Sequence, residues 1–183
     1  MLSIFKNRSQ KIRIPSVIVF IMVLCLSCEL SKINRGWRVK HGGAYIGSDP
    51  AISPNGSTVV FGSPNTGLGD IYTMRLDGSN RKRLTDNPAY DGEPRFSPDG
   101  KKIVFVSERD GGYGHIFIMN SDGSEQRPLT ATVYADYGPA VSPDGMKIAF
   151  LRQVDTNPNA RWKTEIFIMN SDGSGLSRLT SSH

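Results

Sequence analysis

A four-residue pattern, Ser-Pro-(Asp/Asn)-Gly, constrains the fold of this chain more than any other feature of its sequence. The three copies begin at Ser53, Ser97 and Ser142, which are 44 and then 45 residues apart. After each copy come an apolar run, a loop, an Ile-(Tyr/Phe)-(Thr/Ile)-Met segment, an Asp-Gly-Ser turn and a closing Leu-Thr. A fixed period of this length is typical of repeat architectures.

Each repeat predicts four short antiparallel strands. In Ser-Pro-Asp-Gly, Pro suits the second position of a type I turn and Gly the left-handed position after it, an arrangement that commonly joins two strands. Between the turns lie apolar, β-branched runs of strand length, such as residues 103–106 and 116–119. After Leu30, no segment combines a helical spacing of apolar residues with caps. The chain is therefore predicted to be all-β.

Four antiparallel strands in about 45 residues correspond to one blade of a β-propeller. In residue sequence as well as in period, the repeats resemble the WD40-like repeat of the TolB type. The resemblance is carried by Phe-Ser-Pro-Asp-Gly-Lys-Lys-Ile-Val-Phe at residues 96–105 and Ile-Phe-Ile-Met-Asn-Ser-Asp-Gly-Ser at residues 166–174. It extends over residues from about 50 to 180 and is weakest in the first repeat, which has Asn55 in place of Asp.

The predicted fold is a partial propeller of three four-stranded antiparallel blades, preceded by a linker at residues 29–49. Within that linker, residues 35–47 align by spacing with the end of a blade and predict one extra outer strand. Propellers typically have four to eight blades, so three alternatives stay open: a piece of a longer gene product, a homodimer that completes six blades, or either a stable open arc or a complex with another protein. The blades are expected at about residues 50–92, 93–137 and 138–183.

The N-terminal segment predicts export from the cytoplasm. A basic stretch from Lys6 to Arg13 precedes an apolar run at residues 14–26, which matches a signal-peptide core and is short for a membrane span. We assign residues 1–28 to an export signal, with a retained anchor as the alternative; either places the rest outside the cytoplasmic membrane. Four of the 22 Lys and Arg residues and none of the 17 Asp and Glu residues precede residue 28. The basic charge therefore belongs to the leader, and we expect no nucleic-acid binding.

The only cysteines, Cys25 and Cys28, end the apolar run. Cys25-Leu26-Ser27-Cys28 resembles a bacterial lipobox, which implies lipidation of Cys28, although Cys25 stands where that pattern usually has Leu. The alternative is ordinary cleavage nearby. Contact with the membrane is expected only through the signal or a lipid anchor, and a disulfide framework is excluded.

Blade topology separates the loops into two groups. The Ser-Pro-Asp-Gly and Asp-Gly-Ser turns share one face, and the middle loops and blade-to-blade connections share the other. The second face varies most, because residues 152–164 of the third repeat replace the shorter 107–114 of the second. Loops on a rigid scaffold are where binding residues concentrate. The candidate partner-binding residues are polar or aromatic and lie on this face: Tyr90, Asp91, Glu93, Tyr134, Asp136, Tyr137, Arg152, Arg161 and Trp162.

Structural roles for these residues stay open as alternatives. Asp91 and Asp136 occupy matching positions, six residues before their Ser-Pro turns, and each could cap a backbone turn between blades. Trp162 could pack over its own blade instead of anchoring a partner.

The sequence shows no pattern of catalytic or metal-binding residues. There is no Gly-x-Ser-x-Gly motif for a nucleophilic serine, and the chain has only three histidines. These, His41, His115 and His183, are not clustered as a zinc site requires. We therefore predict no enzyme activity, no metal and no cofactor.

The TolB-like resemblance implies a periplasmic or membrane-anchored protein that binds others, since TolB works with a peptidoglycan-associated lipoprotein. The predicted function is a non-enzymatic protein-binding scaffold of the bacterial cell envelope, with an envelope protein or peptide as partner. The alternative is a fragment of a larger propeller protein, such as a propeller-type polysaccharide lyase or the propeller domain of a peptidase.

Overall fold

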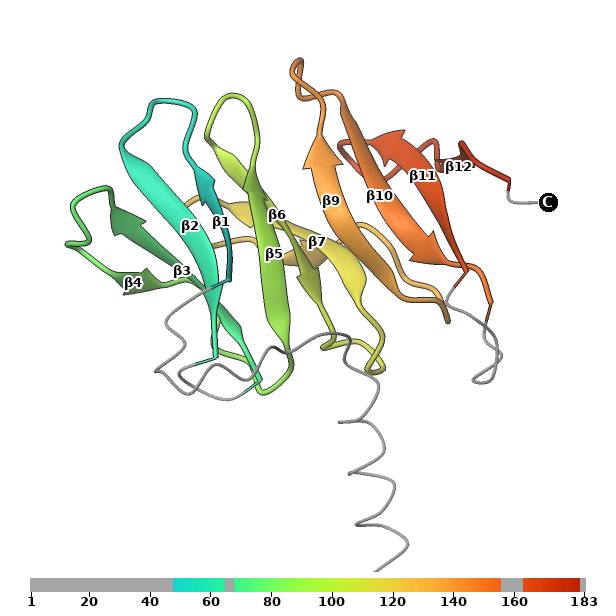
Figure 1. Cartoon of the computed structure of the whole chain (residues 1–183), viewed down its shortest axis with the longest axis horizontal. Helices are drawn as coiled ribbons and strands as arrows, with labels where there is room; N and C mark the ends of the chain where they lie inside the picture. The colour runs from blue at the N-terminus through green and yellow to red at the C-terminus, as the bar shows by residue number, and fades with distance from the viewer. Residues whose placement is uncertain (1–47, 65–67, 156–162, 182–183) are drawn as a thin grey trace, which may run out of the picture. The chain divides into compact units, whose positions relative to one another are not determined.

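The computed structural model describes residues 48–64, 68–155 and 163–181, which form three separate four-stranded sheets (Figure 1). The extra outer strand expected at residues 35–47 and the export signal lie outside the described residues. No helix in the described part of the chain is long and apolar enough to cross a membrane.

The strands are β1 (Ser48–Ile52), β2 (Thr58–Ser63), β3 (Asp70–Arg75) and β4 (Lys82–Arg83) in blade 1; β5 (Asp91–Phe96), β6 (Lys102–Ser107), β7 (His115–Asn120) and β8 (Arg127–Pro128) in blade 2; and β9 (Asp136–Val141), β10 (Lys147–Gln153), β11 (Thr164–Asn170) and β12 (Ser177–Arg178) in blade 3.

Within each blade the strands follow one another in sequence order and pair antiparallel. The predicted all-β fold with four strands per repeat is therefore confirmed. The first strands, β1, β5 and β9, stand side by side, and each of β5 and β9 also packs against the preceding blade (Figure 1).

The Ser-Pro-(Asp/Asn)-Gly turns are built by their own side chains. In blade 2 the Gly100 N–H donates to the Ser97 carbonyl at 2.8 Å, with Gly100 at a φ of 70°. The Ser97 hydroxyl donates to the Asp99 carboxylate at 2.6 Å and accepts the Lys102 N–H at 2.9 Å. This hydroxyl, together with the Lys101 N–H, lowers the pKa of Asp99. The turn therefore closes on contacts within five residues of sequence.

The first interface between blades is a buried apolar cluster with members from blades 1 and 2. Blade 2 presents Ile103, Phe105, Phe117 and Met119 to it, all at most 2% exposed. The remaining buried members come from blade 1: Val60, Ile71 and Leu84.

The second interface uses the opposite face of blade 2. Because side chains alternate along a strand, Val104 and Val106 of β6 point the other way and pack against Ile148, Phe150 and Met169 of blade 3. Blade 2 is thus buried on both faces, which is why its strands read as uninterrupted apolar runs. Each such side chain contributes about 1.5–3 kcal/mol on burial.

A second set of contacts repeats at both interfaces. The Gly123 backbone of one Asp-Gly-Ser turn lies so close to blade 1 that an added Cβ would stand 3.0 Å from the Leu84 carbonyl oxygen. Gly173 makes the same approach to Leu129, at 3.1 Å. The Leu of each Leu-Thr therefore receives the next blade's turn, which fixes how neighbouring blades meet.

Candidate partner-binding face

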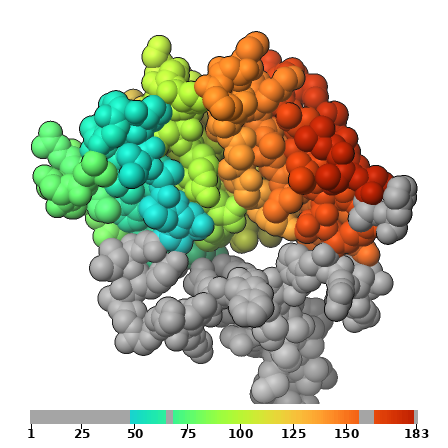
Figure 2. Space-filling view, turned by 45° about the horizontal axis from the view of Figure 1, so that its top comes forward, coloured from blue at the N-terminus to red at the C-terminus, as the bar shows by residue number. Residues whose placement is uncertain are grey.

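The blades have two ends of different character. The turn end carries the Ser-Pro and Asp-Gly-Ser turns, and Figure 2 shows the Ser-Pro turns of the three blades side by side in cyan, yellow-green and orange. The loop end carries the middle loops and the connections between blades. Of the described candidate residues, Tyr90 and Tyr134 lie in the connections between blades. Asp91 and Glu93 lie in β5, Asp136 and Tyr137 in β9, and Arg152 near the end of β10.

Asp136 and Arg152 form a buried ion pair at paired positions of β9 and β10. Arg152 donates from Nε to Asp136 Oδ1 at 2.6 Å and from Nη2 to Oδ2 at 2.8 Å. The two residues are 0% and 6% exposed. The Arg152 guanidinium also lies over the rings of Phe150 and Phe167, 5.3 and 4.8 Å from their centroids. This pair stabilises blade 3 and does not reach the surface.

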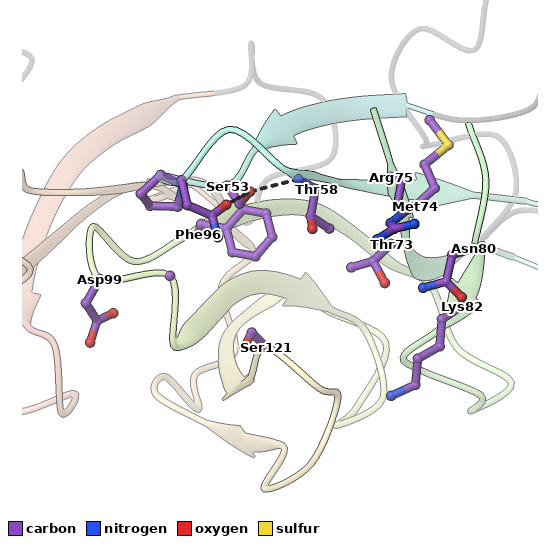
Figure 3. Close-up of a pocket in the computed structure, with 13 residues that line it drawn as sticks. Ser53, Thr58, Thr73, Met74, Arg75, Asn80, Lys82, Phe96, Asp99 and Ser121 are labelled. Carbon is purple, nitrogen blue, oxygen red and sulfur yellow. Dashed lines mark hydrogen bonds between the residues drawn. The ribbon is translucent and has the colours of Figure 1, made fainter. Parts of the chain in front are cut away.

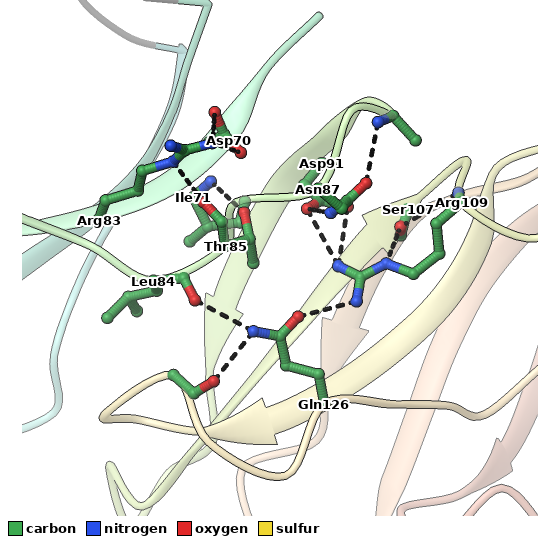
Figure 4. A network of polar contacts seen from close by, with 12 residues as sticks. Asp70, Ile71, Arg83, Leu84, Thr85, Asn87, Asp91, Ser107, Arg109 and Gln126 are labelled. Atoms are coloured by element: carbon green, nitrogen blue, oxygen red, sulfur yellow. Dashed lines mark hydrogen bonds and ion pairs between the residues drawn. The ribbon is translucent and has the colours of Figure 1, made fainter. Parts of the chain in front are cut away.

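Asp91 occupies the same position in blade 2 and is equally buried. Its partner on β6 is Ser107, so the guanidinium comes instead from Arg109 in the middle loop, whose Nη2 lies 3.0 Å from Asp91 Oδ2 (Figure 4). The Asn87 side chain donates to the same carboxylate oxygen. Asp91 therefore ties the blade connection and the middle loop to β5.

Arg109 also links blade 2 to blade 1. It donates to Gln126 Oε1 at 2.8 Å, and Gln126 Nε2 in turn donates to the Leu84 carbonyl at 3.0 Å (Figure 4). The guanidinium lies 5.7 and 4.8 Å from the ring centroids of Phe105 and Phe117.

In blade 1 the guanidinium over the aromatic pair comes from a third position in the repeat. Arg81, just before β4, lies 5.3 and 4.4 Å from the ring centroids of Phe61 and Tyr72 and donates to Ser63 at 3.0 Å. Every described blade thus holds one guanidinium over its cross-strand aromatic pair, a favourable cation–π geometry. Sequence reasoning missed Arg81 and Arg109; the aromatic pair that recurs in each repeat was the available signal.

The residue at the loop end of the third strand of each blade is also polar, and in two blades it forms an ion pair. Asp70 pairs with Arg83 at 3.0 Å, and Glu165 pairs with Arg178 at 2.8 Å. Blade 2 has His115 at the acidic position, with Nε2 2.7 Å from the Thr132 carbonyl oxygen. His115 therefore holds the blade 2–blade 3 connection in place.

Glu93 lies at a bulge in β5, where the backbone φ is 55°. Asp49 and Gly138 occupy the equivalent bulges of β1 and β9, with φ of 50° and 63°. Glu93 Oε2 accepts the Gly138 N–H at 2.6 Å, which connects β5 to β9. Burial raises the pKa of Glu93, and the Gly138 hydrogen bond opposes that rise.

The three candidate tyrosines differ in exposure. Tyr90 and Tyr137 are half-buried and pack against the cluster between blades 2 and 3. A Cβ at Gly69 would stand 3.0 Å from the Tyr90 ring, so the missing side chain there makes room for it. Burial raises the pKa of Tyr137. Tyr134 is 36% exposed and is the tyrosine of this group most open to a partner.

Exposed apolar side chains lie on two joined segments, the middle loop of blade 2 and the connection to blade 3. Tyr113 is 49% and Val133 66% exposed, beside Tyr134 in sequence. The two segments are joined because the Asp136 N–H donates to the Gly114 carbonyl at 2.7 Å. Sequence reasoning missed Tyr113 and Val133, although the Gly-rich loop around Tyr113 was a signal. Arg161 and Trp162 lie outside the described residues.

The turn end contains two equivalent pockets, of about 620 and 580 Å³, one at each interface between blades. The first is lined by residues such as Ser53, Phe96 and Lys82 (Figure 3), and Ser97, Val141 and Arg127 take these places in the second. Among the described residues, no group of three His, Cys, Asp or Glu side chains could hold a metal ion. The pockets repeat with the blades, and at the loop end Leu68 of blade 1, 37% exposed, precedes Gly69 as Tyr113 precedes Gly114 in blade 2.

The family model described as the TolB beta propeller domain matches residues 30–183. The Tol-Pal system protein TolB of Bordetella pertussis is 48% identical over 46 residues, which are 25% of this chain and 10% of that protein. Dipeptidyl-peptidase 5 of Porphyromonas gingivalis is 36% identical over 70 residues, 35% of this chain and 10% of the peptidase. The crystal structure of TolB from Acinetobacter baumannii is similar with a TM-score of 0.62 and 28% identity, over 75% of this chain and 33% of that one. The chain spans about a quarter or less of the length of the curated relatives it matches.

Proposed function

Since this chain belongs to the TolB beta propeller domain family, we propose that it is a non-enzymatic protein-binding module of the bacterial cell envelope. Its partner is an envelope protein or peptide, which binds at the loop end of the blades. The relative from Bordetella pertussis is a Tol-Pal system protein, which supports an envelope role.

One observation carries the proposal: the exposure of Tyr113, Val133 and Tyr134 on two segments that the hydrogen bond from the Asp136 N–H to the Gly114 carbonyl joins. These side chains are 49%, 66% and 36% exposed, and exposed apolar groups on neighbouring segments are typical of protein interfaces. The pairs Asp91–Arg109 and Asp136–Arg152, whose carboxylates are fully buried, hold the first residues of β5 and β9. A preorganised surface of this kind loses little conformational entropy on binding.

The residues predicted from sequence take different parts in this proposal. Tyr134 contacts the partner directly, together with Arg161 and Trp162 of the long middle loop of blade 3. Asp91, Asp136 and Arg152 position the loops, and Glu93, Tyr90 and Tyr137 support the inner strands. Among the described residues, the partner contacts are therefore the side chains that the joint leaves in solvent.

Location in the envelope follows from the predicted leader. Export places the blades in the periplasm or on the outer side of the cytoplasmic membrane, and lipidation of Cys28 anchors them there. The variant Cys28→Ser is expected to move the protein from the membrane fraction to the soluble fraction. An unchanged distribution, measured by fractionation, would point to ordinary cleavage or a retained anchor.

Site-specific photocrosslinking tests the binding face. A photoreactive residue is placed at Val133 on the loop end or at Met146 on the turn end, both 66% exposed. In intact cells we expect a discrete adduct with one envelope protein from position 133 and none from position 146.

Two substitutions test whether the adduct reflects binding through these side chains. Tyr113→Ser combined with Tyr134→Ser should abolish the adduct from position 133, since binding loses its exposed aromatic contacts. Equal adducts from both positions, or an adduct that survives the double substitution, would contradict the assignment of the loop end.

A second candidate function is favoured by the identity to dipeptidyl-peptidase 5. In that case the blades are the propeller part of a peptidase, and the loop end contacts a hydrolase domain. The same crosslinking experiment separates the two functions, because mass spectrometry of the adduct identifies either a hydrolase domain or a separate envelope protein.

A further inference from the structure

The two outer faces of the three-blade array carry the two halves of the joint that occurs twice inside it. Each internal joint has a rear half on the earlier blade and a front half on the later one. Blade 3 ends the described array with a rear half, and blade 1 begins it with a front half. Neither half is filled by another described blade.

The rear half on blade 3 is apolar and exposed. Leu179 is 58% exposed, whereas its counterpart in blade 1, Leu84, is 8% exposed and lies in the first cluster. Ile166 is 40% exposed, whereas Ile71 and Ile116 at the same position of blades 1 and 2 are fully buried. These side chains belong to the face that, in blades 1 and 2, packs against the next blade.

The front half on blade 1 is also open. Ile52 is 62% exposed, whereas Phe96 and Val141, which end β5 and β9 at the same position, pack against the two clusters. Of these three residues, Ile52 is thus the one with no preceding described blade to pack against.

The turn glycines show the same difference. A Cβ at Gly123 would stand 3.0 Å from Leu84 of the preceding blade, and one at Gly100 would stand 3.5 Å from Pro54. At the corresponding glycines of blade 1, Gly78 and Gly56, a Cβ would meet nothing within 4 Å. Blade 1 therefore presents the glycine half of the contact, and blade 3 presents Leu179, the half that receives it.

We propose that a second copy of this chain docks head to tail on these faces, with blade 1 of one copy against blade 3 of the other. The occupant is a second copy because the chain itself carries both halves of a joint that it forms twice. Two copies related by a two-fold axis close with two such joints into six blades, within the four-to-eight range of propellers. The inference does not depend on the loop-end function, since it concerns the lateral faces of the blades.

The test uses the full chain, exported and purified in two differently tagged forms that are produced together. Co-purification of the two tags and the mass by light scattering report self-association. We expect a dimer whose dissociation constant rises about 100-fold or more in Leu179→Lys, because the joint then buries an unpaired ammonium group. Met146→Lys, at a position that is 66% exposed and is occupied by Lys101 in blade 2, should leave the dimer unchanged.

Mixing two variants tests the head-to-tail geometry. Ile52→Lys damages the front half, and Leu179→Lys damages the rear half, so each homodimer has two damaged joints. The mixed dimer has one intact joint, and we expect it to form preferentially over both homodimers. Circular dichroism verifies folding of each variant, and Ile166→Lys replaces Leu179→Lys if that variant unfolds.

Three results would overturn the proposal. They are a full chain that stays monomeric at all concentrations, a dimer indifferent to Leu179→Lys, and a variant mixture that associates no better than its components. If the dimer is absent and the loop-end adduct still forms, the dimer proposal is wrong but the proposed function is unaffected. The two proposals can therefore fail independently.

Discussion

The turn end and the loop end of the same blades are stabilised in opposite ways. At the turn end, equivalent residues make equivalent bonds in each blade, as Ser97 and Asp99 do in blade 2 and Ser142 and Asp144 in blade 3. At the loop end, the same guanidinium position is filled by three arginines from three different places in the repeat. Hydrogen bonds within a turn thus require the same residues at the same positions of each repeat. A contact made across strands requires only the same chemical group, which different positions can supply.

The largest effect is expected from breaking a loop-end ion pair. Arg152→Ala leaves the fully buried Asp136 carboxylate unpaired, which should destabilise the protein by about 3–5 kcal/mol. Urea unfolding of the variant and the parent measures the difference. Lys147→Ala on the same strand, an exposed position, is the control and should change stability by less than about 0.5 kcal/mol. A similar, small loss in both variants would mean that the loop end is no more dependent on tertiary contacts than the turn end.

Two glycines separate turn geometry from contact between blades. Gly78 and Gly123 occupy the same turn position, with φ of 81° and 94°. Alanine at either should cost about 1–2 kcal/mol because of the left-handed backbone, but only at Gly123 does the new Cβ press on Leu84. Gly123→Ala should therefore be less stable than Gly78→Ala by at least about 1 kcal/mol. Equal thermal or urea stability of the two variants would show that the turns do not press against the neighbouring blade.

A smaller effect is expected from titrating one turn. The hydrogen bond from Ser97 lowers the pKa of Asp99, so its contribution to stability is present above the unfolded value of about 3.9. It is lost as the pH falls through the lower folded value. Asn55 makes the same bonds in blade 1 without titrating, so Asp99→Asn should fold normally and lose less stability than the parent below about pH 4. Identical acid unfolding curves would count against a role for the carboxylate charge.

The smallest effect is expected at Glu93 and has the opposite sign. Burial raises the pKa of Glu93, so its ionisation disfavours the folded state, and stability falls as the pH rises from the unfolded value of about 4.3 to the higher folded one. Glu93→Gln keeps an acceptor for the Gly138 N–H and cannot ionise. Relative to the parent, this variant should gain stability between pH 4 and pH 7, which thermal melts at both values would measure. If the stability difference between the variant and the parent is the same at both pH values, Glu93 is exposed to solvent and its ionisation does not affect folding.

The blades were predictable from sequence because their signals are local. Ser97, Asp99 and Gly100 act within one turn, and the uninterrupted apolar runs of residues 103–106 and 116–119 fit strands buried on both faces. The polar contacts of the candidate residues were less predictable. Asp91 and Asp136 stand out at matching positions, yet their partners lie 18 and 16 residues away, and only the pairing of strands brings Arg109 and Arg152 to them.

The binding face shows the same limit. Tyr113 and Val133 are 20 residues apart in sequence, and their segments are joined because the Gly114 carbonyl accepts a hydrogen bond from the Asp136 N–H. Exposure of a tyrosine depends on what packs over it, so sequence could not separate the exposed Tyr134 from the half-buried Tyr90 and Tyr137.

The sequence by itself determined the repeat, its four strands and its turns, because these depend on φ preferences and on side-chain contacts a few residues apart. Only the tertiary structure decided which charges are buried, which arginine reaches each aromatic pair, and which apolar faces remain open. Those properties depend on distances between residues that are remote in sequence, and a repeat pattern sets the spacing along the chain but not the neighbours in space.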